Sequence, residues 1–154
     1  MSFAETIKRM TQAIVSGDGQ GAAACFTADG TYHDVFYGPF TGADIADMVD
    51  NIFHRDGTNF RWDLHDAVEQ DGVGYVRYVF SYESKMEQSK GKRAIFEGVS
   101  ICRMEGDLIA DYTEVANSAI GLQCLGFTAD RTARFIAKQG LELKARDEAK
   151  AHLG

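Results

Sequence analysis

Aromatic side chains recur at every second position in three stretches of the sequence, which makes them candidates for a binding site. The stretches carry Phe60, Trp62 and Leu64, then Tyr78, Phe80 and Tyr82, and then Phe96, Gly98 and Ser100. Every second side chain of a strand points to the same face, so each stretch forms one wall. Aromatic strand faces usually belong to a core. If Gly98 and Ser100 leave space, these walls instead enclose an apolar cavity suited to a flat, ring-shaped or polyketide-like ligand.

Carboxyl groups stand on two further predicted strands. Asp34 lies near the end of a short strand, and Glu114 shares one face of the last strand with Tyr112 and Ala116. A carboxyl group enclosed by apolar walls exchanges protons near neutral pH, because burial disfavours its charged form. Each residue also has a structural alternative. Asp34 would bond the backbone amides of the following turn, and Glu114 would bond a cross-strand partner or water.

Histidines and cysteines lack the spacing of a metal site. The residues concerned are His33, His54, His65, His152, Cys25, Cys102 and Cys124. None forms H-x-x-x-H or C-x-x-C, so we expect no metal ion, and we expect buried free thiols in a reducing cytosol. The chain has no G-x-G-x-x-G, P-loop or nucleophile elbow, so we expect no nucleotide cofactor.

Composition indicates one folded domain. The chain has 154 residues, of which 45% are hydrophobic and 25% are charged. Its net charge of −7 would repel phosphate backbones, so we do not expect a nucleic-acid partner. No apolar run approaches the roughly 18 residues of a membrane helix, and no signal peptide precedes the first helix. We therefore expect a cytoplasmic protein without a membrane segment.

Three helices are predicted in the first third of the chain. The first begins with a capping box of Ser2 and Glu5 and has one apolar face, formed by Phe3, Ile7, Met10 and Ile14. Asp18 is expected to cap a short second helix over residues 22–26. Thr41 and Asp44 predict the start of a third helix, with apolar positions at Ile45, Met48, Val49, Ile52 and Phe53.

The remaining pattern is that of strands. A short strand over residues 30–35 and a turn at residues 37–39 precede the third helix, and a period of two begins at Asn59. Turns at residues 71–72, 90–91 and 105–107 divide the later region into an antiparallel meander of four strands. A final helix follows Thr128. Helices packed on one face of an antiparallel sheet form an α+β domain, and a strongly curved sheet leaves a pocket inside a cone.

Several short motifs occur in a characteristic order. They are Ser16-Gly17-Asp18, Phe26-Thr27-Ala28-Asp29-Gly30, Tyr32-His33-Asp34, Pro39 with Thr41-Gly42, and Arg103 through Ile109. With these motifs the chain resembles the NTF2-like superfamily, specifically its SnoaL-like and ketosteroid-isomerase-like members. The resemblance implies a cone-shaped, cystatin-like fold, whose curved antiparallel sheet wraps the N-terminal helices. That domain would span residues 1–120, and residues 121–154 would form a helical extension of it.

The resemblance also implies roles for the carboxyl groups. Asp34 falls where ketosteroid isomerases carry their general base, and Glu114 falls where the superfamily's epoxide hydrolases carry an aspartic acid. Together they would form a base and an acid for elimination or hydration chemistry. The isomerase oxyanion donors, a tyrosine and a protonated aspartic acid, are replaced near Met10 and Ser100, so steroid isomerisation is not expected. Nor is the hydrolase Asp–Arg–Asp set reproduced, because Arg77 falls on the opposite face from Tyr78.

The outer face of the sheet is predicted to be a partner surface. It would carry Ile95, Val99 and Ile101 flanked by Arg77, Glu97 and Arg103. Superfamily members resembling this chain commonly dimerise through that face, so we expect a homodimer.

The leading hypothesis is a cofactor-independent enzyme of the isomerase, dehydratase or cyclase type that acts on a small apolar compound. Asp34 and Glu114 would be catalytic. The expected substrate-binding residues are Trp62, Tyr78, Phe80, Tyr82, Phe96, Ser100 and Tyr112. The alternatives are a module that binds a small molecule or a peptide without chemistry, and a purely structural dimerisation domain.

Overall fold

Helix α1 (Phe3–Ser16) opens the chain in the computed structural model, which describes residues 1–154. The predicted capping box is confirmed. The backbone N–H of Glu5 donates to the Ser2 hydroxyl, and that of Ser2 donates to the Glu5 carboxylate. Gly17, with a left-handed φ of 79°, ends the helix. The predicted apolar face is also confirmed, because its side chains are at most 3% exposed: Phe3, Ile7, Met10 and Ile14.

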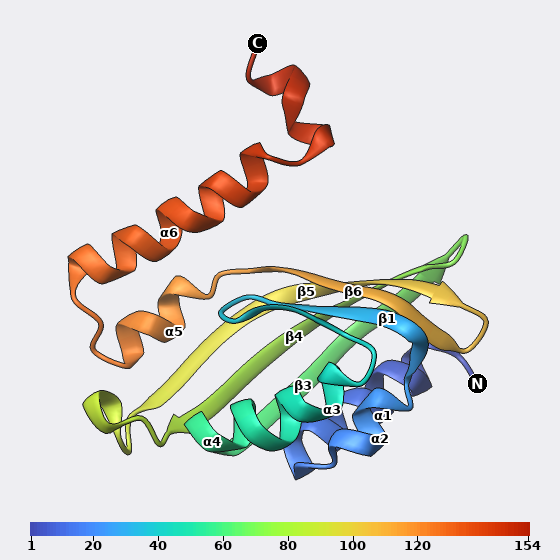
Figure 1. Ribbon diagram of the computed structural model, residues 1–154, viewed down its shortest axis with the longest axis horizontal. Coiled ribbons are helices and arrows are strands. Elements are labelled where there is room, and N and C mark those ends of the chain that lie inside the picture. The colour runs from blue at the N-terminus through green and yellow to red at the C-terminus, as the bar shows by residue number, and fades with distance from the viewer.

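Short helical segments complete the layer that the sheet wraps (Figure 1). They are α2 (Gly19–Ala23), α3 (Asp44–Asp47), the π-helical η1 (Met48–Phe53) and α4 (His54–Asp56). Asp18 caps α2 as predicted, but α2 ends at Ala23 because Phe26 already begins a strand. The predicted cap at Thr41 is wrong. Its hydroxyl instead bonds that of Thr31 on the neighbouring strand, 3.1 Å away, and α3 begins at Asp44 without a side-chain cap.

Six strands form one sheet in the order β2-β1-β6-β5-β4-β3. Their bounds are β1 (Phe26–Asp34), β2 (Gly38–Thr41), β3 (Gly57–Gln70), β4 (Val73–Ser84), β5 (Arg93–Glu105) and β6 (Leu108–Ala116). The predicted meander is confirmed, since β3 to β6 are consecutive antiparallel neighbours. β1 joins the sheet by pairing in parallel with β6. The short 3-10 segment η2 (Glu87–Ser89) lies in the connection between β4 and β5.

The chain around β1 and β2 differs from the prediction. β1 begins at Phe26 rather than Gly30, and the expected turn at residues 37–39 lies earlier, at residues 35–37. Pro39 is part of the edge strand β2. An edge strand tolerates proline, because a missing N–H there need not remove a bond between strands.

The core lies between α1 and the concave face of the sheet. Tyr32 and Tyr112 stack inside it with ring centroids 4.4 Å apart, and both are at most 1% exposed. Cys25 and Cys102 are buried there, whereas Cys124 is only half-buried, and all three are free thiols. This packing fixes the positions of β1 and β6, the strands that carry Asp34 and Glu114.

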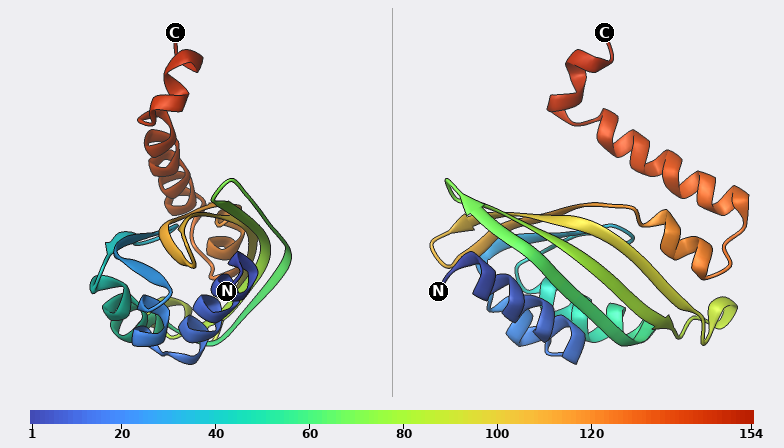
Figure 2. Two further views of the ribbon diagram at one scale, coloured as in Figure 1. Left: turned by 90° about the vertical axis from the view of Figure 1, so that its right-hand side faces the viewer. Right: turned by 180° about the vertical axis from the view of Figure 1, so that it is seen from behind.

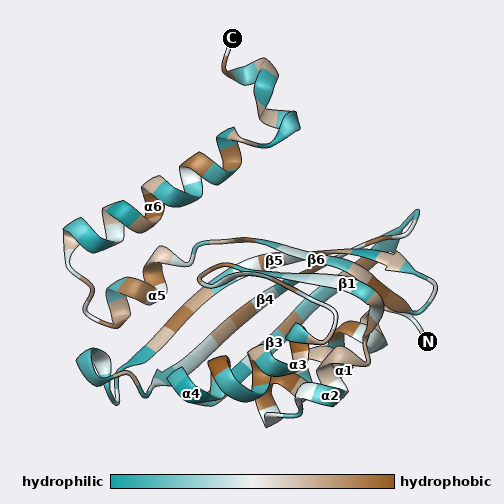
Figure 3. Cartoon of the chain, in the orientation of Figure 1, coloured by the Kyte–Doolittle hydropathy of each residue, from teal (hydrophilic) through white to brown (hydrophobic).

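The C-terminal segment contacts the sheet through α5 (Ala119–Cys124) and the β1–β2 turn through Phe135 of α6 (Ala129–Lys144), whose ring centroid is 5.5 Å from that of Phe36. α5 packs against β5, and Leu122 and Leu125 are buried. α6 is capped by Thr128 as predicted and is followed by η3 (Asp147–His152). α6 extends away from the sheet on the side opposite to α1–α4 (Figures 1 and 2), and none of its residues is buried. Hydrophobic positions nevertheless occur along it (Figure 3).

None of the helices combines the length and the apolar character that crossing a membrane requires.

Candidate active site

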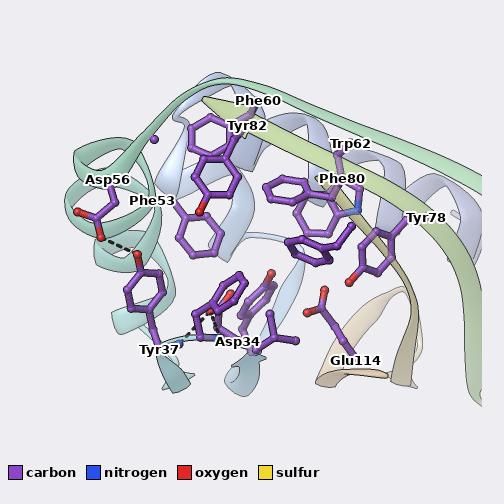
Figure 4. A pocket seen from close by; sticks show the side chains of 15 residues that line it. Asp34, Tyr37, Phe53, Asp56, Phe60, Trp62, Tyr78, Phe80, Tyr82 and Glu114 are labelled. Carbon is purple, nitrogen blue, oxygen red and sulfur yellow. Dashed lines mark hydrogen bonds between the residues drawn. The ribbon is translucent and has the colours of Figure 1, made fainter. Parts of the chain in front are cut away.

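A pocket lies on the concave face of the sheet (Figure 4). Its lining consists of Tyr32, Asp34, Val35, Phe36, Tyr37, Phe53, Asp56, Gly57, Phe60, Trp62, Tyr78, Phe80, Tyr82, Phe96 and Glu114. Three carboxyl groups and no lysine, arginine or histidine belong to this set. The cavity volume is about 50 Å³, against the roughly 10–15 Å³ needed to hold one water molecule. The pocket therefore has room for several water molecules, and its lining is largely apolar.

The aromatic wall comes from the predicted strand faces. Trp62, Tyr78, Phe80, Tyr82 and Phe96 all line the pocket. Their rings contact one another across the strands, with centroids 5.2 Å apart for Trp62 and Phe80 and 5.5 Å apart for Phe80 and Phe96. Most of these contacts are edge-to-face, a favourable geometry for aromatic pairs, and Tyr82 is tilted against Phe80.

Asp34 both bonds the following turn and lines the pocket. It ends β1, and its Oδ2 accepts hydrogen bonds from the backbone N–H groups of Phe36 and Tyr37, at 2.8 and 3.0 Å. The same carboxyl group lines the pocket. Burial raises the pKa of Asp34 to about 6, although the two backbone hydrogen bonds act in the opposite direction. The turn therefore positions the carboxylate without making it a strong acid.

Glu114 lies on β6 at the opposite side of the pocket, and a buried chain of hydroxyls holds it. The Tyr112 hydroxyl donates to Glu114 Oε1, and the Ser100 hydroxyl lies 2.8 Å from that of Tyr112. Burial, together with the charge of Asp34, raises the pKa of Glu114 to about 8, and the neighbouring hydroxyls of Tyr112 and Tyr78 partly offset this rise. Glu114 therefore holds its proton at neutral pH, whereas Asp34 is mostly ionised.

Two expected substrate-binding residues lie behind the pocket rather than in its lining. Ser100 and Tyr112 are fully buried, and they contact Glu114 or each other. Gly98 does not leave the expected space either. A Cβ atom there would lie 2.8 Å from the Tyr78 hydroxyl, so Tyr78 already occupies that volume. Met10 is buried in the core, and Arg77 pairs with Asp66 on the outside.

A cluster at the pocket rim was not predicted from the sequence. The Tyr37 hydroxyl donates to Asp56 Oδ2 at 2.5 Å, and Arg55 Nε lies 2.7 Å from Asp56 Oδ1. The hydrogen bond from Arg55 lowers the pKa of Asp56, although burial opposes the shift. This contact ties the β1–β2 turn to α4. Phe36 and Tyr37 follow Asp34 in a turn, where no periodicity indicates the direction of a side chain.

Comparison with models of protein families shows which family the chain belongs to. A family model described as the SnoaL-like domain matches residues 7–112. The chain belongs to the SnoaL-like domain family. No curated protein matches it.

Solved structures share the fold of this SnoaL-like domain at low sequence identity. A hypothetical protein with a ketosteroid isomerase-like fold from Catenulispora acidiphila, in complex with trimethylamine, has a TM-score of 0.72 and 19% identity, over 84% of this chain and 98% of that one. The putative polyketide cyclase IdmH from Streptomyces antibioticus has a TM-score of 0.64 and 17% identity, over 80% and 98%.

An epoxide hydrolase of the LEH-like type from M. tuberculosis has a TM-score of 0.65 and 11% identity, over 79% of this chain and 86% of that one. At these identities the neighbours show the fold of the SnoaL-like domain. Its family and its pocket indicate a small-molecule enzyme or binding protein.

Proposed function

We propose that the protein is a cofactor-independent enzyme that moves protons on a small apolar carbonyl compound, in an isomerisation, dehydration or cyclisation. The observation that carries the proposal is the pair of carboxyl groups in one aromatic pocket, with pKa values of about 6 for Asp34 and about 8 for Glu114. At neutral pH one is ready to accept a proton and the other to donate one, which is the condition for efficient general acid–base catalysis.

The chemistry follows from these protonation states. Asp34 takes a proton from the carbon next to the carbonyl group, and the electrons of that C–H bond form a C=C bond. The carbonyl π electrons move to oxygen, which Glu114 protonates. Returning a proton to a different carbon completes an isomerisation. In a dehydration, the electrons on oxygen re-form the carbonyl group and the β-hydroxyl group leaves as water, taking the proton of Glu114 in place of the carbonyl oxygen. In a ring closure, the same enolate carbon attacks a second carbonyl carbon of the substrate, and the oxygen of that second carbonyl takes the proton of Glu114.

Residues behind the pocket would keep the acid in place. Tyr112 and Ser100 form a chain of hydroxyls that ends at one oxygen of Glu114. We infer that this chain leaves the other oxygen, Oε2, to face the ligand. Phe80 and Phe96 would keep water away from the carbanion.

Exchange of carbon-bound hydrogen for deuterium in a simple ketone tests this proposal. We expect the protein to accelerate exchange at the carbons adjacent to the carbonyl of cyclohexanone, followed by NMR in D₂O. The rate should rise as pH passes about 6 and fall as it passes about 8. Asp34→Asn should lower the rate by roughly 100-fold or more. Glu114→Gln should lower the maximum and abolish the fall at high pH.

Glu97→Gln is the matched control, since Glu97 is exposed on the outer face of β5. It should exchange as the unmodified protein does. Exchange that is equally fast in Asp34→Asn would contradict the proposed base.

A second candidate is binding of a small organic cation without chemistry. The neighbour from Catenulispora acidiphila was solved with trimethylamine. The pocket here has aromatic faces and carboxyl groups with no basic residue, a combination that attracts alkylammonium ions. Saturable binding of trimethylammonium with no exchange activity on any ketone would favour this candidate.

A further inference from the structure

Two buried polar atoms of the pocket wall have no hydrogen-bond partner: the indole nitrogen of Trp62 and the hydroxyl of Tyr78. Both side chains line the pocket. By contrast, Asp34 Oδ2 accepts from two backbone amides and Glu114 Oε1 accepts from Tyr112. Buried donors without acceptors are rare in proteins and call for a specific explanation.

The two donors are neighbours on the same face of the sheet. Trp62 on β3 pairs with Phe80 on β4, and Tyr78 pairs with Leu64, so the two residues are diagonal across these strands. Their ring centroids are 5.7 Å apart. Figure 4 shows the indole nitrogen on the side of Trp62 that faces Tyr78, and the Tyr78 hydroxyl turned toward Glu114. The donors thus bound the region of the pocket next to the acid.

The two donors require a ligand that carries a neutral hydrogen-bond acceptor. An indole N–H only donates. The Tyr78 hydroxyl lies beside the Glu114 carboxyl group but makes no hydrogen bond with it, so it is also available as a donor. An acceptor atom is therefore missing. A carboxylate or phosphate is unfavourable there, because the pocket holds three carboxyl groups and no basic side chain. A neutral carbonyl oxygen accepts two hydrogen bonds without bringing a full negative charge.

We propose that Trp62 and Tyr78 form the site that binds the carbonyl oxygen of the ligand. The inference rests on the proposed function for the role of that oxygen in catalysis, but the binding itself needs no base. The two donors would stabilise the negative charge that develops on oxygen when Asp34 removes a proton. They would replace the two oxyanion donors of ketosteroid isomerases, whose positions fall near Met10 and Ser100 in this chain. Met10 is in the core, and the Ser100 hydroxyl bonds that of Tyr112.

The experiment compares two ligands of the same shape, cyclohexanone and methylenecyclohexane, of which only the first carries an acceptor oxygen. Trp62 is the only tryptophan in the chain, so intrinsic fluorescence reports directly on the site. We expect cyclohexanone to bind about 10-fold more tightly than methylenecyclohexane. Tyr78→Phe should reduce this preference by roughly 3- to 10-fold. Trp62→Phe, measured by calorimetry, should reduce it by a similar factor.

Tyr75→Phe is the matched control. Tyr75 lies on the same strand, but 45% of its surface is exposed. It should keep the full preference. As a second measurement, the infrared band of the bound carbonyl should move to lower frequency in the unmodified protein, and this shift should shrink in Tyr78→Phe. The band reports the hydrogen bonds even if a variant is less stable.

The outcomes separate this proposal from the catalytic one. Asp34→Asn should retain the preference for the ketone while losing exchange activity. A preference for cyclohexanone without any exchange would refute the acid–base mechanism and support the oxygen site. Equal binding of the two ligands, an unshifted carbonyl band, or no saturable binding of cyclohexanone would overturn the oxygen site.

Discussion

Asp34 and Glu114 have the same functional group but different pKa values, because their partners differ. Asp34 accepts two backbone hydrogen bonds that favour its charged form and partly offset the effect of burial. Glu114 is similarly enclosed, and the charge of Asp34 adds to the cost of ionising it. The two titrations are coupled, so a measured profile reports the pair rather than either residue alone.

This pair gives stability a definite dependence on pH. The pKa of Asp34 is raised from 3.8 to about 6, and that of Glu114 from 4.5 to about 8. Between these limits the folded state binds more protons than the unfolded state, so the free energy of unfolding falls as pH rises. The contribution is complete below about pH 4 and lost above about pH 8. Glu114→Gln should therefore reduce the slope between these limits and become the more stable protein at the alkaline end.

Urea denaturation across that pH range measures the slope. Glu87→Gln, at an exposed position of η2 outside the proposed dimer face, controls for the loss of a carboxyl group as such and should keep the slope of the unmodified protein. An unchanged slope in Glu114→Gln would show that this carboxyl group titrates as it does in the unfolded chain.

At the residue scale, the sequence predicted which side of the sheet a residue faces better than how deep it lies. Alternation correctly assigned Trp62, Tyr78 and Glu114 to the concave face. It also assigned Ser100 and Tyr112 there, but their bonds to each other and to Glu114 place them behind the pocket. Depth depends on the curvature of the sheet and on neighbouring side chains, which a period of two does not encode.

At the scale of elements, local signals explain what was predicted and what was missed. Strands β3 to β6 are long and separated by glycine turns, so their period was clear. β2 is short and contains Pro39, and it exists only because β1 offers it an edge. Its misassignment also concealed the turn that carries Phe36 and Tyr37 into the pocket lining.

The contact between that turn and α4 should control access to the pocket. The hydroxyl of Tyr37 bonds Asp56 at the rim, where Tyr37 is 43% exposed. Tyr37→Phe removes the bond while keeping the ring. We expect ligand association and dissociation to become several-fold faster, with little change in affinity, because the bond ties the turn in both the free and the bound protein. Stopped-flow fluorescence of Trp62 with cyclohexanone measures both rates.

Tyr75→Phe again serves as the control, since it removes an exposed hydroxyl from the outer face. Rates that remain unchanged in Tyr37→Phe would show that the ligand enters by another route.

At the scale of the whole molecule, two apolar surfaces of the chain lack a partner. On the outer face of the sheet, Val99 is opposite Val115 and Tyr75 is opposite Ile101. Val115 is 62% exposed and Ile95 is 48% exposed. α6 presents Ile136, Leu141 and Leu143, each at least 49% exposed. A helix of this length is marginal in water without tertiary contacts.

We propose that a second copy of the chain covers both surfaces. α6 stands on the outer side of the sheet (Figure 2), so a copy docked on that face would also lie beside the helix. A specific interface of this kind must bury roughly 1,000 Å² or more. Light scattering at micromolar concentration should therefore give the mass of a dimer, twice 16.9 kDa.

Substitutions locate the interface. Val115→Arg places a charge in the centre of the outer face and should produce a monomer, because burying an unpaired charge is costly. Removing residues 129–154 should weaken the dimer and leave the sheet folded, since the only buried residue it removes is Ala149, although it also removes the contact of Phe135 with Phe36. Gln20→Arg is the control, because Gln20 is exposed on α2, on the other side of the sheet. A monomer in the unmodified protein, or a dimer that survives Val115→Arg, would contradict the proposed interface.

The pocket opens on the concave side, so the monomeric variant should still bind cyclohexanone, which would show that each copy carries a complete site.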